Sequence, residues 1–229
     1  MKKLVVLTGA GMSAESGIST FRDSDGLWEQ HNVEDVATPE GFAANPRLVL
    51  DFYNQRRRQL LTCHPNGGHT GLAELEKYFD VTIITQNIDN LHEKAGSTHI
   101  IHLHGELMNA RSSADPSLIY PLSAEKCDIH LGDLCEKGSQ LRPDVVWFGE
   151  AVPMIAEAAR ITEQANIFVI IGTSMNVYPA AGLLGYVHKK VPVYLIDPKD
   201  VHTNRYDIHH IKKGASEGVK ELKQLLLGE

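Results

Sequence analysis

The sequence predicts an α/β fold, a doubly wound parallel sheet with a smaller inserted lobe. Six continuous apolar runs are typical of strands buried on both faces, and they occupy residues 4–7, 81–84, 100–103, 145–148, 167–171 and 191–196. Between these runs, apolar residues recur at the i, i+3, i+7 spacing of a helix, first within residues 72–79 and again within residues 219–226. Strands that alternate with helices in this way predict the doubly wound arrangement.

Two stretches interrupt this alternation. Residues 25–65 are expected to form loops and helices only, and residues 106–142 are polar, rich in Ser and Asp, and carry two of the three cysteines. We expect these insertions to pack together as a small lobe, while residues 1–24, 66–105 and 143–229 form the large lobe. The cleft between the two lobes is then the expected ligand site.

The composition is that of one soluble domain, because 229 residues with 42% hydrophobic content suit a single large domain with an insertion. The net charge of −7 argues against a nucleic-acid-binding surface, which usually carries a basic excess. No apolar run approaches the roughly 18 residues of a membrane span, and the run after Met1 is too short for a signal peptide. Three dispersed cysteines do not suggest a disulfide framework. We expect a cytoplasmic monomer that binds neither nucleic acid nor membranes.

A glycine motif follows the first apolar run. Residues 9–14 read G-x-G-x-x-A, which is typical of the strand-to-helix turn that accepts a dinucleotide pyrophosphate in a Rossmann-like fold. Gly9 is expected to permit the tight turn, Gly11 to let the backbone approach the phosphates, and Ala14 to let the helix lie close to the strand. The phosphates would then bind at the helix N-terminus.

The segment after this motif argues against a dehydrogenase. The next strand-like run begins only at Val81, so no acidic residue closes a second strand about 20 residues after the glycines, where a ribose-binding one is expected. Residues 16–22 are polar and contain a glycine, as in an ordered loop over a ligand. The sequence therefore predicts a dinucleotide-binding protein with a chemistry other than hydride transfer.

Five segments carry a family resemblance. They are GAGMSAESGISTFR (9–22), TQNIDNLH (85–92), HLHGEL (102–107), RPDVVWFGE (142–150) and GTSMNVYPA (172–180). In this order, across nearly the whole chain, they resemble the sirtuins, a family of NAD-dependent protein deacylases, and in particular the bacterial class III-like members. The resemblance implies that the enzyme breaks the nicotinamide–ribose bond of NAD and passes the ADP-ribose to the carbonyl oxygen of an acylated lysine. The products are free lysine, nicotinamide and an O-acyl-ADP-ribose.

The resemblance implies three catalytic residues. His104 matches the family's catalytic histidine, and an imidazole that titrates near physiological pH can serve as the general base. Asn87 would orient the nicotinamide ribose and a water, and Asp89 would bind the nicotinamide carboxamide. The alternative for Asn87 and Asp89 is that they cap a helix beginning near Ile88. His99 and His102 are interpreted as structural rather than metal-binding.

The resemblance also implies a set of NAD contacts on several loops, namely Gly9, Ala10, Gly11, Ser13, Phe21, Arg22, Gln86, Asn87, Ile88, Asp89, His104, Gly172, Thr173, Ser174, Asp197 and Ala215. Asp197 departs from the family, which usually has asparagine at this position. An aspartate can still accept hydrogen bonds from ribose hydroxyls, so NAD binding is expected to survive the change.

The substrate peptide is expected to add as a strand between two loops. The matching residues are Val146, Phe148, Gly149 and Glu150 on one side, and Met175, Asn176 and Val177 on the other. This mode of binding reads the peptide backbone, so we expect broad tolerance of the sequence around the acylated lysine.

Tyr53 and Arg56 look like the signature of the sirtuin subclass that accepts dicarboxylic acyl groups. They lie at i and i+3 on a predicted helix, where a guanidinium fork and a phenol could bind the distal carboxylate of succinyl-lysine. The alternative is that residues 56–58 form a solvated helix face, and we adopt this alternative for Arg57 and Arg58. The sequence thus predicts a desuccinylase and demalonylase that also removes acetyl groups.

The chain departs from the family at the zinc site. Most sirtuins hold zinc with two C-x-x-C pairs, but residues 108–114 contain no cysteine. Cys127, Cys135 and His130 make three ligands where structural zinc almost always has four. We therefore predict free thiols and no structural zinc, and we expect Cys63 to be a small buried residue.

Two other functions remain open. The same chemistry could serve an ADP-ribosyltransferase or an NAD hydrolase, and a non-enzymatic alternative is an NAD-sensing binding domain. Tyr53 and Arg56 argue against the first alternative, and the intact set of Asn87, Asp89 and His104 argues against the second.

Overall fold

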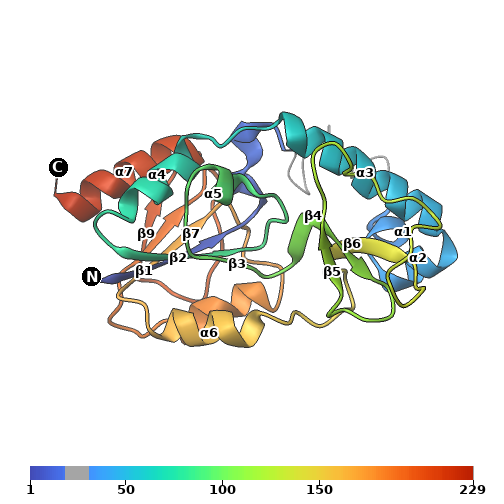
Figure 1. The fold of residues 1–229 in the computed structure, drawn as a ribbon. Helices are drawn as coiled ribbons and strands as arrows, with labels where there is room; N and C mark the ends of the chain where they lie inside the picture. The colour runs from blue at the N-terminus through green and yellow to red at the C-terminus, as the bar shows by residue number, and fades with distance from the viewer. Residues whose placement is uncertain (19–30, 229) are drawn as a thin grey trace.

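The computed structural model describes residues 1–18 and 31–228 (Figure 1). In this part of the chain, six strands form one parallel sheet: β1 (Lys3–Thr8), β2 (Asp80–Thr85), β3 (Ile100–His102), β7 (Ile167–Ile171), β8 (Val193–Ile196) and β9 (Ile208–Ile211). Their spatial order is β3-β2-β1-β7-β8-β9, and every pairing is parallel. When only these six strands are numbered along the chain, their spatial order is 3-2-1-4-5-6. This is the doubly wound order of dinucleotide-binding folds, so the predicted fold class is confirmed.

The two faces of the sheet are covered by different helices (Figure 1). Leu4 and Val6 of β1 belong to a buried cluster with α4 (Gly67–Leu75) and α7 (Ala215–Leu227). Val5 and Leu7 point the other way, into a cluster with α6 (Ile155–Glu163) and the 3₁₀ segment η3 (Ala180–Tyr186). Burial on both faces explains why the strands of the sheet appear as continuous apolar runs in the sequence.

A second, antiparallel sheet has the order β5-β4-β6 and comprises β4 (Gly105–Ser112), β5 (Ile119–Pro121) and β6 (Leu141–Val145). It packs with the helices α1 (Val33–Val36), α2 (Pro39–Ala44) and α3 (Pro46–Thr62). A short helix, α5 (Leu91–Lys94), follows β2. In the described part of the chain, none of the helices is long and apolar enough to cross a bilayer.

The strand expected at residues 145–148 was placed wrongly. Val145 is instead the last residue of β6 in the antiparallel sheet, and residues 146–148 lie outside any strand. Val145 and Trp147 are buried in a cluster with α3, whereas Phe148 is half exposed. The run is apolar because it packs on one side against α3. β9 was not predicted, because it has no continuous apolar run. It is an edge strand with two histidines between two isoleucines.

Hydrogen bonds from side chains of α3 connect the first insertion to the second. The amide of Asn54 donates to the carbonyl of Ile129 at 3.0 Å and accepts from its N–H at 2.9 Å. Arg57 donates to the carbonyl of Leu107 and to the side chain of Asn54. The interpretation of Arg57 as a solvated residue is therefore wrong, because it is fully buried and satisfies carbonyl and amide oxygens. Arg58 is exposed and pairs with Asp128, in agreement with its predicted place on the solvated face.

All three cysteines are free and buried. The expectation of a small buried residue at position 63 is confirmed. The thiol of Cys135 donates to the Ser112 hydroxyl at 3.4 Å, that of Cys127 donates to Asp128, and His130 is exposed. These thiols are thus held by hydrogen bonds and packing within the described residues.

Candidate active site

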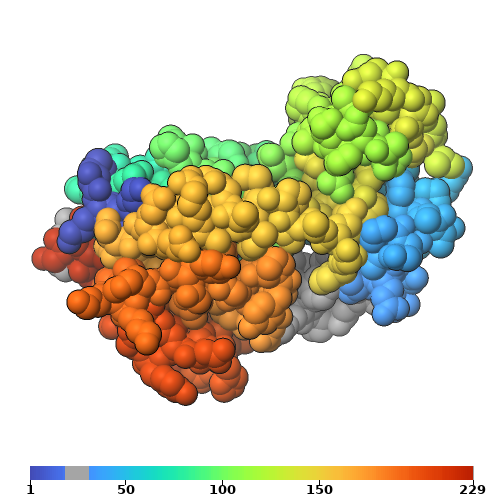
Figure 2. Space-filling view, turned by 90° about the horizontal axis from the view of Figure 1, so that it is seen from below, coloured from blue at the N-terminus to red at the C-terminus, as the bar shows by residue number. Residues whose placement is uncertain are grey.

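A cleft of about 1330 Å³ opens at the carboxyl ends of β1, β2 and β7 and extends to α3 and the end of β6. Figure 2 shows the light-blue helices and the green small sheet at one end of the molecule and the orange and red carboxyl-terminal segments at the other. Nearly every expected site residue that the structure describes lines this cleft: Gly9, Ala10, Gly11, Ser13, Tyr53, Arg56, Gln86, Asn87, Ile88, Asp89, His104, Val146, Phe148, Gly149, Glu150, Gly172, Thr173, Ser174, Asn176, Val177, Asp197 and Ala215.

Two expected site residues, Phe21 and Arg22, lie outside the described residues. Of the described site residues, Met175 is not among those that line the cleft. Met175 is 8% exposed, packs in the core beneath the sheet, and has a left-handed backbone with φ 56°. A substrate contact at Met175 would therefore come from its backbone, while the neighbouring Asn176 and Val177 face the cleft.

The glycines of the first loop are required by the loop after β7. A Cβ atom on Gly9 would lie 2.7 Å from the Cβ of Thr173, and one on Gly11 would lie 2.7 Å from the Cα of Gly172. Gly9 itself is extended, with φ −128°, and a side chain there is excluded by this close approach of the two loops. The two loops meet where the strand order reverses, which is where doubly wound folds bind ligands.

The expected α-helix after these glycines is not present at residues 10–16. Two 3₁₀ turns occupy Ala10–Met12 and Ala14–Ser16, and Ala14 is exposed rather than packed on the strand. The expected helix, at whose N-terminus the phosphates were predicted to bind, is therefore not formed in this segment. Any anion here would instead meet the backbone of the short turns and of the Gly172 loop.

A chain of hydrogen bonds connects the loop after β1 with the loop after β2 inside the cleft. Asn87 donates from its side-chain amide to the Ser13 hydroxyl at 3.1 Å, and Ser13 donates to the carboxylate of Asp89 at 2.9 Å. Asp89 also accepts from the N–H of Leu91, the first residue of the short helix α5, at 3.1 Å. Burial raises the pKa of Asp89, against the effect of these two hydrogen bonds. The helix expected near Ile88 begins only at Leu91, with Asn90 as its N-cap residue, so neither Asn87 nor Asp89 is that cap. The Asn87 side chain turns to Ser13.

His104 is held as a neutral base. Its Nδ1 atom lies 2.9 Å from the carbonyl oxygen of Gln86, and since a carbonyl can only accept, Nδ1 carries the proton. The other ring nitrogen, Nε2, is then the proton acceptor. Burial lowers the pKa of His104 below its ordinary value, although the bond to Gln86 opposes this, so the ring is neutral at pH 7. This is the protonation state that a general base requires.

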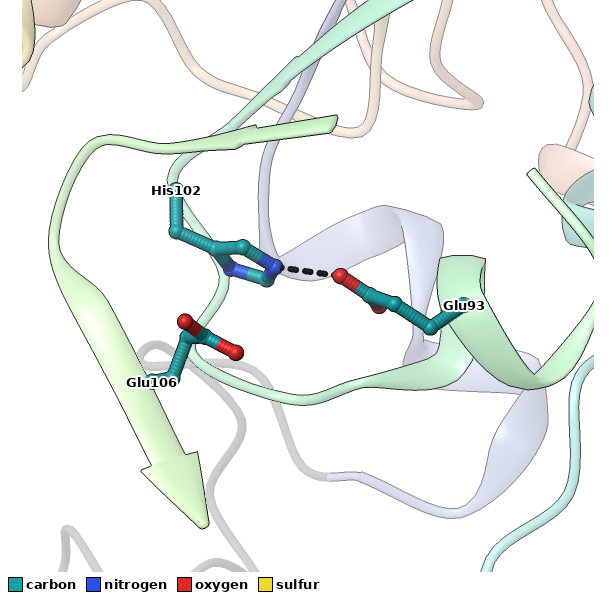
Figure 3. Close-up of side chains that lie close together, drawn as sticks. All are labelled: Glu93, His102 and Glu106. Carbon is teal, nitrogen blue, oxygen red and sulfur yellow. Dashed lines mark hydrogen bonds and ion pairs between the residues drawn. The ribbon is translucent and has the colours of Figure 1, made fainter. Parts of the chain in front are cut away.

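His102 holds the next carbonyl of the same loop. Its Nδ1 donates to the carbonyl of Asn87 at 3.2 Å, and its Nε2 pairs with Glu93 at 2.7 Å (Figure 3). Burial lowers the pKa of His102, but the hydrogen bond and charge of Glu93 outweigh this and raise it overall. The carboxylate of Glu106 lies within 4.8 Å of the same atoms. With both ring nitrogens bonded, His102 takes the structural place that its sequence position suggested, and His99 is exposed.

His69 and Asn66 are parts of the site region that sequence reasoning missed. His69 is fully buried, accepts at Nδ1 from the N–H of Asn66, and places Nε2 3.5 Å from the Ser13 hydroxyl. Burial lowers its pKa to about 4, so it is neutral. The signal was present in the sequence, because Asn66 and His69 form an N-cap and N3 capping box at the start of α4.

Tyr53 and Arg56 lie one turn apart on α3, and both line the cleft. Tyr53 is 1% exposed, and burial raises the pKa of its phenol. Burial lowers the pKa of Arg56, which the charges of Tyr53 and Asp89 oppose. The cleft is therefore lined by a guanidinium and a phenol from α3 together with Ser13, Asp89 and His104.

The fold and the cleft define a dinucleotide-binding α/β protein with its site at the switch point of the sheet. Residues 9–179 match the Sir2 family. The chain belongs to this family, as the sirtuin resemblance implied.

Two relatives carry the name NAD-dependent protein deacylase. The one from Bacteroides thetaiotaomicron is 64% identical over 232 residues, which cover 99% of this chain and 99% of the relative. The one from Helicobacter pylori is 60% identical over 199 residues, which cover 87% of this chain and 86% of the relative.

Solved structures agree. A Sir2 homologue with ADP-ribose has a TM-score of 0.90 at 37% identity, covering 100% of this chain and 94% of the other. A Sir2 homologue with NAD has a TM-score of 0.88 at 39% identity, covering 99% and 90%. A Sir2 protein with a p53 peptide and NAD has a TM-score of 0.81 at 28% identity, covering 99% and 94%.

Proposed function

We propose that this protein is an NAD-dependent protein-lysine deacylase that removes succinyl and malonyl groups as well as acetyl groups. The two relatives described above are named NAD-dependent protein deacylases, and solved members of the family bind NAD, ADP-ribose and a peptide. The observation that carries the acyl preference is that Tyr53 and Arg56 line the same cleft as Asn87, Asp89 and His104. The proposed products are nicotinamide and an O-acyl-ADP-ribose.

The residues present fit a dinucleotide. Gly9, Gly11 and Gly172 leave a side-chain-free floor where the loops after β1 and β7 touch. Asp197 follows β8 at the same edge of the cleft and offers a carboxylate to ribose hydroxyls. When bound, NAD supplies the ribose carbon that is attacked and nicotinamide as the leaving group.

The chain's own groups supply orientation and a base. Asn87 and Asp89 are fixed through Ser13, so their remaining oxygen and nitrogen atoms have defined directions before a ligand arrives. His104, neutral and with Nε2 as its acceptor, takes a proton from a ribose hydroxyl in the proposed reaction. The peptide is proposed to lie along residues 146–150 and 175–177, which flank the cleft.

The acyl terminus is proposed to meet Arg56 and Tyr53. A guanidinium stays charged when buried and offers a two-pronged donor to a carboxylate, and a protonated phenol adds one more hydrogen bond. An acetyl group has no distal acceptor for these donors. Tyr53 and Arg56 therefore strengthen the binding of succinyl and malonyl groups, and they do not exclude acetyl groups.

Substitution of Arg56 tests the acyl preference. Arg56→Met is expected to lower kcat/KM for a succinyl-lysine peptide about 10- to 100-fold more than for the matching acetyl-lysine peptide, as the loss of a charge-assisted bond predicts. Arg58→Met on the same helix removes an exposed arginine and is the control. An equal succinyl rate in Arg56→Met and the parent enzyme would remove the dicarboxylic assignment.

The general activity is tested on one peptide carrying acetyl, succinyl or crotonyl lysine, with and without NAD, followed by mass spectrometry. NAD-dependent loss of acyl groups is the expected result, with succinyl lost fastest. Nicotinamide release without deacylation would indicate an ADP-ribosyltransferase or NAD hydrolase, and NAD binding without turnover would indicate a sensor.

The oligomeric state, the location and the metal content of the enzyme are also proposed. We propose that the enzyme acts as a monomer in the cytoplasm, where the free state of its three buried thiols would be maintained. We also propose that the small lobe, residues 25–65 and 106–142, is held without structural zinc, through bonds such as those of Asn54 to Ile129.

A further inference from the structure

We propose that Trp147 is a specificity-determining residue, because its indole N–H fixes the direction in which the Tyr53 hydroxyl donates. This inference rests on the dicarboxylic acyl specificity proposed above. Trp147 lies between the cleft and the core, 2% exposed, and its Nε1 atom is 3.0 Å from the phenol oxygen of Tyr53. It therefore touches the acyl-binding pair without itself belonging to the pair.

The direction of this hydrogen bond is unambiguous. An indole N–H can only donate, so the phenol oxygen of Tyr53 is the acceptor and its own proton points elsewhere. Among residues 1–18 and 31–228, no side chain or carbonyl accepts that proton. A buried donor without an acceptor is costly unless something that enters the site satisfies it. Since Tyr53 lines the cleft, the acceptor that fits is an anion at the end of the acyl group.

The indole is held firmly in this position. The guanidinium of Arg142 lies 3.3 Å from the centre of its ring, and the ring of Phe42 packs 5.3 Å away. Glu150 accepts from the backbone N–H of Trp147 at 2.8 Å and from Arg142 at 2.7 Å. The Glu150–Arg142 pair thereby fixes both the backbone and the ring face of Trp147.

The protonation states agree with this arrangement. Burial raises the pKa of Tyr53, so the phenol keeps its proton at neutral pH and can donate to a carboxylate. Arg56, one turn away on α3, supplies the positive charge that the same carboxylate requires. Tyr53 donates with a fixed direction and Arg56 supplies charge. Trp147 is thus the positioning residue that turns a buried phenol into a directed donor for dicarboxylic acyl groups.

The test is a double-mutant cycle on acyl selectivity. Trp147→Phe keeps an aromatic ring beneath Arg142 but removes the N–H. We expect it to lower the ratio of succinyl to acetyl kcat/KM about fivefold to tenfold, mainly through the KM for the succinyl peptide, as loss of one hydrogen bond predicts. Combined with Tyr53→Phe, it should cause no further loss of selectivity, because Trp147 acts only through the Tyr53 hydroxyl, which Tyr53→Phe removes.

Phe42→Leu is the matched control, because Phe42 packs on the same indole without touching its N–H. It should leave the selectivity ratio unchanged. Equal losses for acetyl and succinyl peptides in Trp147→Phe, additive effects with Tyr53→Phe, or the same selectivity change in Phe42→Leu would each overturn the inference. The dicarboxylic proposal itself fails if the parent enzyme shows no succinyl preference and Arg56→Met has no effect. If Arg56→Met lowers the succinyl preference but Trp147→Phe does not, only the inference about Trp147 fails.

Fluorescence gives a second readout that does not need Trp147→Phe to fold. The chain has two tryptophans, so Trp28→Phe leaves Trp147 as the sole reporter. A succinyl-lysine peptide, added with ADP-ribose, should shift the emission of Trp147 more than the acetyl-lysine peptide does. Identical spectra with both saturating peptides would overturn the coupling of Trp147 to the acyl terminus.

Discussion

The Nδ1 atom of His104 donates to the carbonyl oxygen of Gln86 across 2.9 Å, and this single contact decides which nitrogen of the ring can act as a base. His102, two residues earlier, makes the equivalent bond to the carbonyl of Asn87 at 3.2 Å. His102, at the end of β3, and His104 therefore donate to two consecutive backbone carbonyls of the loop after β2. The proposed base, His104, and the loop proposed to orient the ligand are therefore fixed to one another.

The pH dependence of deacylation should report the neutral state of His104. Burial lowers its pKa below the ordinary 6.5, and activity needs the unprotonated ring. The acidic limb of kcat/KM is therefore expected to have its midpoint below pH 6.5, with activity lost as the pH falls through it. His104→Ala should abolish the limb together with about 10²- to 10⁴-fold of the rate. A midpoint above pH 6.5 would contradict the neutral-base assignment.

The junction of α3 with the loop around Ile129 should be sensitive to Asn54. Asn54→Ala removes the partners of the buried N–H and carbonyl of Ile129 and of the buried Arg57. We expect the free energy of unfolding to fall by about 3 kcal/mol, since each buried group left unpaired costs about 1–3 kcal/mol. Urea denaturation measures it, with Arg58→Ala on the same helix as the exposed control. Equal midpoints for the two variants would contradict the role of Asn54.

The His102–Glu93 pair should make stability depend on pH. Because Glu93 raises the pKa of His102 in the folded state, its contribution is fully present below the unfolded pKa of about 6.5 and is lost as the pH rises through the folded value. The stability difference between the parent protein and Glu93→Gln is therefore expected to be largest near pH 5.5, at about 1 kcal/mol, and to shrink toward pH 9. Chemical denaturation at several pH values measures this, and a difference that grows with pH would refute it.

The contact of the two glycine loops can be tested with a single methyl group. The Cβ of Gly11→Ala would lie 2.7 Å from the Cα of Gly172, which is backbone and cannot move aside easily. We expect a loss of about 1–3 kcal/mol in stability and weaker binding of NAD in calorimetry. Gly185→Ala is the control, because its Cβ meets nothing within 4 Å. Unchanged NAD affinity in Gly11→Ala would show that the loops tolerate separation.

Much of the sheet could be predicted from the sequence because its strands are buried on both faces. The runs that became β1, β2 and β7 carry that burial in nearly every residue, so local composition reveals them. β9 lies at the edge and reads Ile-His-His-Ile, and Val145 belongs to a strand with one buried face; neither carries a two-sided signal. Arg57 was misread for a related reason, since nothing local distinguishes a buried arginine from its exposed neighbour.

The sequence by itself determined the doubly wound fold class, the family and most of the residues that line the cleft, because periodicity and short motifs report local burial and local backbone shape. Only the tertiary structure decided what these residues do to one another. Ser13 meets Asp89 from 76 positions away, and Trp147 meets Tyr53 from 94 positions away. Such bonds depend on which loops the strand order and the packing of α3 bring together, and no local pattern encodes that distance.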